Sequence, residues 1–157
     1  MSFPIPELTL QKDLLRFRFG VFFFAAGVIP NPLDVRFQKV SGLKTKVTTS
    51  AHAEGGQNLY TQQLPGSVEQ DHLVLERGMV VGSLLNSELD ATFSLFKFAP
   101  ANVMVTLFNE SMIPVSAWFF MKTFPVSWAT SDLDASEKSL AIDTLKLAYS
   151  RMQILRI

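Results

Sequence analysis

Apolar and polar residues alternate along much of this chain, and a period of two is the pattern of half-buried β-strands. Near the start, every second residue of the range 15–24 is apolar, which predicts a first strand. Residues 35–42 predict a second strand that bends at Gly42, because glycine inside a strand pattern marks a bend or a bulge. Residues 44–50, KTKVTTS, are rich in threonine and polar on both faces, so they predict an exposed strand.

The alternation returns in the second half of the chain. Residues 67–79 predict one strand that is closed by a glycine turn. Residues 103–107 and 115–126 predict a hairpin around a turn at residues 109–111. Residues 140–149 alternate with a slip of one position, which predicts a β-bulge.

Residues 83–98 have the period of a helix instead. Four apolar residues in this range are spaced by four, four and three positions, so they share one helix face: Leu85, Leu89, Phe93 and Phe96. Pro100 prevents the helix from continuing. We expect this apolar face to pack against the sheet.

Together these elements predict a mainly β fold with one α-helix, in which about seven strands form a closed or nearly closed antiparallel, barrel-like sheet. A chain of 157 residues is most simply one domain. Within residues 1–157 we expect an N-terminal extension at residues 1–13 and a β-barrel-like core at residues 14–152, which includes the helix near residues 83–98.

Composition narrows the classes of function. The 14 Lys and Arg residues balance 14 Asp and Glu residues, so the net charge does not predict a nucleic-acid or anionic-membrane partner. The absence of cysteine excludes disulfides and thiol chemistry. The 14 phenylalanines and the hydrophobic content of 48% are high for one small domain, which indicates that subunits bury some of this apolar surface between them.

Neither a membrane-spanning helix nor a signal peptide is expected. The most apolar run, residues 21–28, is far shorter than the roughly 20 residues that a membrane helix needs. Residues 1–10 contain two prolines and one glutamate where a signal peptide would have its apolar segment.

Candidate catalytic and metal-binding residues are few. His52 and His72 lie on polar segments with acidic residues nearby, but they do not have the spacing of a metal site, and solvated histidines are the better interpretation. Asp132 and Asp134 resemble paired acid–base carboxylates, yet closing a turn explains them more simply.

A group of aromatic residues is consistent with a stacking platform for bases, but it lacks interleaved basic residues, so core packing is favoured: Trp118, Phe119, Phe120, Phe124 and Trp128. We therefore predict no catalytic residue, no cofactor and no metal.

The stretch AEGGQNLYTQQLPGSV, residues 53–68, contains a glycine pair but is not a phosphate-binding loop. Such a loop needs a lysine and a following helix, and neither follows Gly55 and Gly56. Two interpretations remain open for this stretch: an ordinary surface loop, and an arm that contacts another subunit.

Seven phrases of the sequence, taken in order, resemble a known family. They include FQKVSGL at residues 37–43, the EGG…YTQQLPG segment, LVLERGMV at residues 73–80 and FPVSWATSDLDASE at residues 124–137. In this order and spacing, from about residue 15 to residue 152, the chain resembles the tail-tube proteins of contractile phages and of related extracellular contractile injection systems.

This resemblance implies a structural role without catalysis. It implies small barrel-like domains that form rings of six subunits, and rings that stack into a hollow tube beside sheath, spike or baseplate proteins. It also implies assembly in the bacterial cytoplasm and a place in a phage tail or tail-like particle, with neither sequence-specific nucleic-acid binding nor membrane insertion. The separated phrase at residues 3–6, FPIP, and the extended entry at residues 31–34 favour the subunit that starts the tube.

Within this picture, the stretch at residues 53–66 is predicted to act between subunits. Leu59 and Tyr60 would anchor the contact, while the glycines allow the backbone to bend. The predicted interface residues are Glu54, Gly55, Gly56, Leu59, Tyr60, Leu64 and Pro65. The alternative function is a monomeric ligand-binding β-barrel whose aromatic residues line a cavity.

Overall fold

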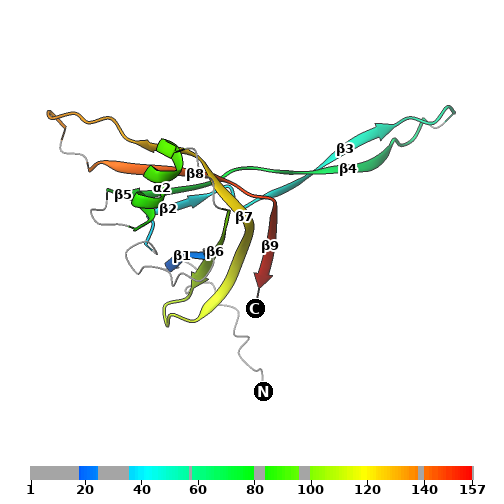
Figure 1. Cartoon of the computed structure of the whole chain (residues 1–157). Helices are drawn as coiled ribbons and strands as arrows, with labels where there is room; N and C mark the ends of the chain where they lie inside the picture. The colour runs from blue at the N-terminus through cyan, green and yellow to red at the C-terminus, as the bar shows by residue number, and fades with distance from the viewer. Residues whose placement is uncertain are drawn as a thin grey trace, which may run out of the picture.

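The computed structural model (Figure 1) describes residues 18–24, 36–56, 58–79, 84–95, 100–137 and 140–156. This described part is mainly β, with one helix, and all of its strand pairs are antiparallel, as the sequence predicts. In chain order the elements are β1 (Arg18–Phe24), β2 (Lys39–Ser41), β3 (Thr45–His52), β4 (Gln62–Gln70), β5 (Leu73–Gly78), α2 (Leu84–Leu95), β6 (Ala101–Phe108), β7 (Pro114–Thr130), β8 (Ile142–Ala148) and β9 (Arg151–Arg156).

Two sheets share the long strand β7 (Figure 1). In sheet A, β6 lies between β1 and the first half of β7, and β9 pairs with the other edge of that half. In sheet B, the second half of β7 pairs with β8, which is followed by β5 and then β2. Strands β1 and β2 stand at the two ends of this order, so hydrogen bonds do not close the sheet within the described residues.

Strand β7 passes from sheet A to sheet B near Lys122. This residue has a φ of 51°, and its N–H donates to Asn102 Oδ1 at 3.2 Å. The register between β6 and β7 shifts at this point, between Ala101 and Val103. A bulge of this kind adds one residue to one strand and increases its twist, which lets a strand turn the corner between two packed sheets.

The core lies between the two sheets. Phe120 of β7 is completely buried, and its ring meets Tyr149 edge-on with 4.8 Å between the ring centres. Trp118 and Trp128 pack on the core, so the predicted role of the aromatic residues is confirmed for these three, whereas Phe124 is 39% exposed. The remaining buried apolar residues are Val21, Val103 and Val105 of sheet A, Leu73, Leu75, Leu145 and Leu147 of sheet B, and Leu85 and Leu89 of α2.

Helix α2 lies within the predicted range but only partly on the predicted face. Leu85 and Leu89 are buried, as expected. The prediction for Phe93 is wrong, because its side chain is 40% exposed, and Phe96 lies outside the described residues. The helix contacts the sheet through its first half, where the side chain of Asn86 also bonds to a side chain of β5.

That bond belongs to a set of buried polar residues under the helix. Arg77 of β5 and Asp143 of β8 face each other in the strand register, and each is more than nine-tenths buried. Arg77 Nη2 donates to Asn86 Oδ1 at 2.7 Å, and its guanidinium lies 5.2 Å from the ring centre of Phe37. Asp143 Oδ1 accepts a hydrogen bond of 2.8 Å from Thr130 Oγ1. These contacts offset part of the cost of burying charge and attach α2 to sheet B.

Asp143 also explains why the predicted bulge in residues 140–149 is wrong. Strand β8 pairs with β5 without a register shift. Asp143 occupies an inward position where the alternation calls for an apolar residue, and the sequence therefore looks as if it slips. The register shift lies on the partner strand β7, between Pro125 and Ser127.

The other strand predictions hold with one exception. Strands β1, β2 and β3 overlap the predicted ranges, and β6 and β7 form the predicted hairpin. The exception is residues 67–79, which are parts of two strands, because β4 ends at Gln70 and β5 begins at Leu73.

Candidate functional site

A two-stranded ribbon projects from the body of the molecule (Figure 1). It consists of β3, β4 and the tip between them, residues 45–70, and is called the arm below. Almost every described residue of the arm is exposed, on both faces of the ribbon. The predicted loop at residues 53–66 is therefore partly wrong, because its last five residues belong to β4 and only residues 53–61 form the tip.

The strand register gives the arm two different faces. Val47 pairs with Val68, and Thr49 pairs with Pro65, so these side chains lie on one face. The other face is polar and charged near the body, where Lys46 pairs with Glu69. Val47 and Val68 are 46% and 58% exposed, so an apolar pair faces solvent in the single chain.

A bulge in the middle of the arm depends on a glycine. The register shifts between Val47 and Thr49, and Thr48 Oγ1 accepts the N–H of Ser67 at 2.9 Å and donates to its carbonyl oxygen at 3.0 Å. A Cβ on Gly66 would lie 2.5 Å from this hydroxyl. The hydroxyl thus fills the place of a side chain and replaces part of the strand ladder.

The arm joins the body at a second glycine. Gly42 has a φ of 86°, and a Cβ there would collide with the carbonyl oxygen of His72, the residue before β5. Only glycine has both the backbone freedom and the small size that this position requires. The predicted bend at Gly42 is confirmed.

Two ion pairs span the arm where it leaves the body. Lys44 Nζ lies 2.8 Å from Asp71 Oδ2, and Lys46 Nζ lies 3.9 Å from Glu69 Oε2. The pKa of Asp71 is lowered mainly by the hydrogen bond from Lys44 and, to a smaller extent, by the positive charge of Lys44. The same two causes, in the same order, raise the pKa of Lys44. All four side chains are largely exposed, so these pairs align the strands more than they stabilise them.

The structure places the predicted interface residues along the outer half of the arm. Glu54, Gly55, Gly56, Leu59 and Tyr60 are in the tip, and Leu64 and Pro65 are in β4. The apolar members are exposed, with Leu59 at 95%, Tyr60 at 57% and Leu64 at 46%. Leu64 and Pro65 point to opposite faces of the ribbon, so the seven residues do not form a single patch.

Sequence reasoning missed Val47 and Val68 as candidate contact residues. Each stands alone among polar neighbours in the sequence. Their significance comes from the cross-strand register, which brings them side by side.

The predicted turn at Asp134 is confirmed. Asp134 Oδ1 accepts hydrogen bonds from the hydroxyl of Ser136 at 2.6 Å and from its N–H at 2.8 Å. Both bonds lower the pKa of Asp134, and the bond from the Ser136 hydroxyl is the larger cause. The carboxylate therefore closes a turn, which is the simpler of the two roles considered for it.

Within the described ranges, three or more His, Asp or Glu side chains do not gather in a way that would hold a metal ion. The described helix is also too short to cross a membrane.

The chain is similar to known proteins over almost its whole length. The family model described as "T4-like virus tail tube protein gp19" matches residues 15–153. A chain of the anti-feeding prophage (AFP) baseplate, a 6-fold symmetrised cryo-EM structure, is 36% identical to this chain, with a TM-score of 0.83. That match covers 99% of this chain and 98% of the other.

Two further solved structures share the fold at lower identity. A chain of the sheath–tube complex of PVC, an extracellular contractile injection system, in its extended state is 18% identical, with a TM-score of 0.78 and coverage of 99% and 100%. A chain of the cap that terminates the AFP tube is 23% identical, with a TM-score of 0.74 and coverage of 100% and 94%. A search of curated protein sequences finds no match.

Proposed function

Because this chain belongs to the T4-like virus tail tube protein family, we propose that six copies form a ring and that this ring is one of the stacked rings that make the hollow inner tube of a contractile particle. The family consists of structural tube proteins, so the chain acts by assembling and not by catalysis. We propose that it is folded and assembled in the bacterial cytoplasm before it becomes part of the phage-tail-like particle.

One observation supports a specific position of this ring in the particle. The match with 36% identity and a TM-score of 0.83 is to a component of a baseplate whose structure has 6-fold symmetry. The matches to a sheath–tube complex and to a tube cap have lower identity, 18% and 23%. We therefore propose that this chain is the tube initiator, the ring that lies between the baseplate or spike and the repeating tube.

The arm supports an assembly role on physical grounds. A two-stranded ribbon with both faces in water is marginally stable by itself. Its exposed apolar residues, such as Leu59 and Val68, would be buried by contact with another copy. We propose that the arm lies against a neighbouring subunit, within a ring or between stacked rings.

Sheet edges support the same proposal. Strand β2 pairs only with β5, and β1 pairs only with β6, so each has an unpaired edge within the described residues. Closed rings made from one repeated contact cover such edges.

The alternative of a monomeric ligand-binding barrel is not supported. Such a carrier needs an open cavity inside the sheet. Here Phe120, Leu73 and Leu75 are completely buried and occupy the space between the sheets. The family membership also assigns the chain to tube proteins.

Electron microscopy of the purified protein, alone and with the repeating tube subunit of the same particle, tests the proposal. We expect six-fold rings from the protein alone, and tubes that carry this protein at one end when both subunits are present. A stable monomer at all concentrations would contradict ring formation. Labelled protein distributed along the whole tube would contradict the initiator role while leaving the tube role intact.

A further inference from the structure

One side chain of the arm forms hydrogen bonds with the body of the molecule. Gln70 is the last residue of β4. In the orientation that satisfies both polar atoms of its amide, Nε2 donates to the carbonyl oxygens of Tyr149 and Ser150, at 3.2 Å each. Among the described residues, the other hydrogen bonds and ion pairs of arm side chains join one strand of the arm to the other. Gln70 therefore ties the arm to the body.

The two acceptors lie in the link between β8 and β9. Strand β8 ends at Ala148 and β9 begins at Arg151, so Tyr149 and Ser150 are the residues at which the chain passes from sheet B to sheet A. Figure 1 shows β9 turning away from β8 beside the base of the arm. The amide of Gln70 thus holds the arm at a point where the two sheets meet.

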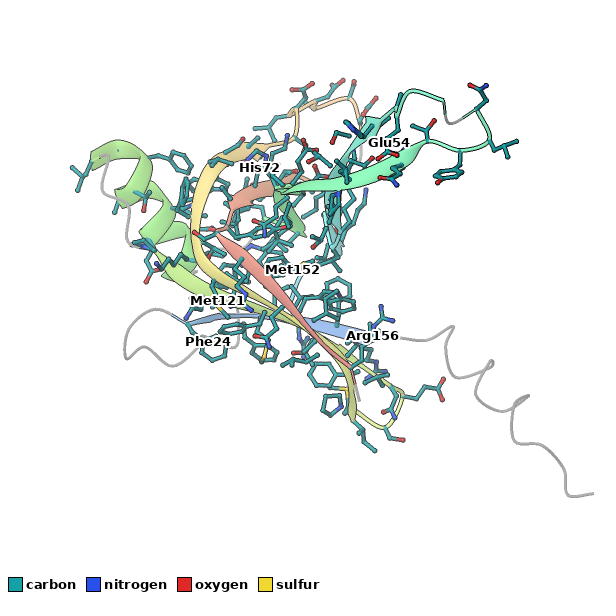
Figure 2. All side chains as sticks on the ribbon, turned by 90° about the vertical axis from the view of Figure 1, so that its right-hand side faces the viewer. Phe24, Glu54, His72, Met121, Met152 and Arg156 are labelled. Atoms are coloured by element: carbon teal, nitrogen blue, oxygen red, sulfur yellow. The ribbon has the colours of Figure 1, made fainter. Side chains whose placement is uncertain are left out.

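This link is attached in turn to the core and to the corner of β7. The ring of Tyr149 packs edge-on against the buried Phe120. The N–H of Ser150 donates to the carbonyl oxygen of Met121 at 3.0 Å, at the corner where β7 changes sheets. Figure 2 shows the two strands that meet here, with Met121 on β7 and Met152 on β9. A continuous set of contacts therefore runs from the arm through the link to the corner of β7.

The arm has few other attachments. Almost all of its described residues are exposed, on both faces of the ribbon. Its strands continue into β2 and β5 through two short links, residues 42–44 and 71–72, and the ion pair of Lys44 with Asp71 joins these links to each other. A long ribbon that is held in this way can swing about its base, so a bond at the base decides where the tip lies.

We infer that Gln70 is a latch that sets the direction of the arm and couples the arm to β9. While the amide holds both carbonyl oxygens, the base of the arm, the β8–β9 link and the corner of β7 move as one unit. Breaking the two bonds lets the arm swing and loosens the start of β9, which within the described residues is paired along one edge only.

The coupling acts in both directions. An arm that is fixed in place makes β9 harder to open, and a β9 that is fixed in place holds the arm. The latch is a property of the single chain, so it does not depend on the proposed ring.

Two nearly isosteric variants remove the latch. Gln70→Glu and Gln70→Met keep the length of the side chain, but neither a carboxylate nor a thioether can donate a hydrogen bond. The matched controls are Gln63→Glu and Gln63→Met, because Gln63 lies in the same strand, is exposed and pairs with Ala51 inside the arm. All measurements use the unassembled chain.

The distance between two spin labels measures the direction of the arm. The chain has no cysteine, so Glu54→Cys in the tip and Glu88→Cys on the exposed face of α2 can be labelled specifically. Electron paramagnetic resonance should give a broader distribution of distances in both Gln70 variants than in the Gln63 controls. An unchanged distribution would overturn the latch. A broader distribution in Gln70→Met alone would also overturn it, because hydrogen-bond donation would then not be the cause.

Hydrogen exchange measures the coupling to β9. Both Gln70 variants should raise the exchange rate of β9 amides by about tenfold, which is the effect of losing two ordinary hydrogen bonds, while β5 and β8 keep their rates. Equal acceleration in β9 and in sheet B would show a general loss of stability and would overturn the coupling, as would unchanged exchange in β9. A Gln70 variant that no longer folds would contradict the inference too, because a latch at the base of the arm is not needed by the core.

Discussion

Replacing the glycine at the base of the arm should destabilise the whole domain. Gly42→Ala has two unfavourable consequences. Alanine must adopt a φ of 86°, and its Cβ collides with the backbone carbonyl oxygen of His72. The left-handed conformation costs a non-glycine residue about 1–2 kcal/mol. The collision adds about 1–3 kcal/mol, as overpacking does, because β5 must move and its first residue, Leu73, is completely buried.

The expected loss in the free energy of unfolding is therefore about 2–5 kcal/mol. Two other glycines of the arm are matched controls. Gly56 has a φ of 92° but lies in open space, so Gly56→Ala should cost about 1–2 kcal/mol at most, and only locally in the tip. A Cβ on Gly55 would meet nothing within 4 Å, and its φ is outside the left-handed region, so Gly55→Ala should change the stability by less than about 1 kcal/mol.

Urea unfolding followed by tryptophan fluorescence measures this difference. The two tryptophans, Trp118 and Trp128, both lie in β7, so the signal reports the body and not the arm. With a urea slope of about 1–3 kcal/mol per molar, a loss of this size shifts the midpoint by roughly 1 M or more. The experiment is done below the concentration at which the chain assembles. A Gly42→Ala midpoint equal to that of Gly55→Ala would refute the reasoning.

Three further predictions concern the core and the ion pair. Phe120→Ala should lower the free energy of unfolding by about 3–5 kcal/mol, and Phe93→Ala by less than about 1 kcal/mol, because only the first ring is buried; equal losses in urea unfolding would contradict this difference. Tyr149→Phe should leave the free energy of unfolding unchanged or raise it by up to about 1 kcal/mol, since the buried Tyr149 hydroxyl has no hydrogen-bond partner among the described residues; a clear loss of stability would show that the hydroxyl has one. Lys44 lowers the pKa of Asp71 below its usual 3.8, so the pair stabilises the arm above that pH and loses its effect as the pH falls through the folded-state pKa. Hydrogen exchange of the arm should therefore depend on Asp71 at neutral pH but not well below about pH 4, which Asp71→Asn checks.

Much of the fold is readable from the sequence because half-buried strands leave a period of two. The hairpin of β6 and β7 and the exposed strand β3 are examples. The pattern fails where a charged residue takes an inward position, as Asp143 does opposite Arg77. Such a residue is stabilised by partners far away in the sequence, which a periodic pattern does not contain.

The helix shows the same limit in another form. Helical periodicity correctly identifies Leu85 and Leu89 as buried, but it continues to Phe93, where the body no longer covers the helix. Periodicity describes which residues share a face and does not say how far the partner surface extends.

The candidate interface was only partly predictable for a related reason. Leu59, Tyr60 and the glycines stand out in the sequence as a loop without a ligand. The pairing of Val47 with Val68 appears only when the register is known.

Strand β7 gives the domain a particular mechanical character. Its 17 residues run without interruption from the β6–β7 turn to the last residue before the β7–β8 loop, and on the way they bond to β6, β8 and β9. Sheet B continues from β8 through β5 to the base of the arm. The hydrogen bonds of a strand pair run perpendicular to the strands. A force applied to the arm along its strands therefore shears many of these bonds at once in each successive strand pair. Sheet B can therefore carry a force from the base of the arm as far as the corner of β7 at Lys122 without first opening a strand pair bond by bond.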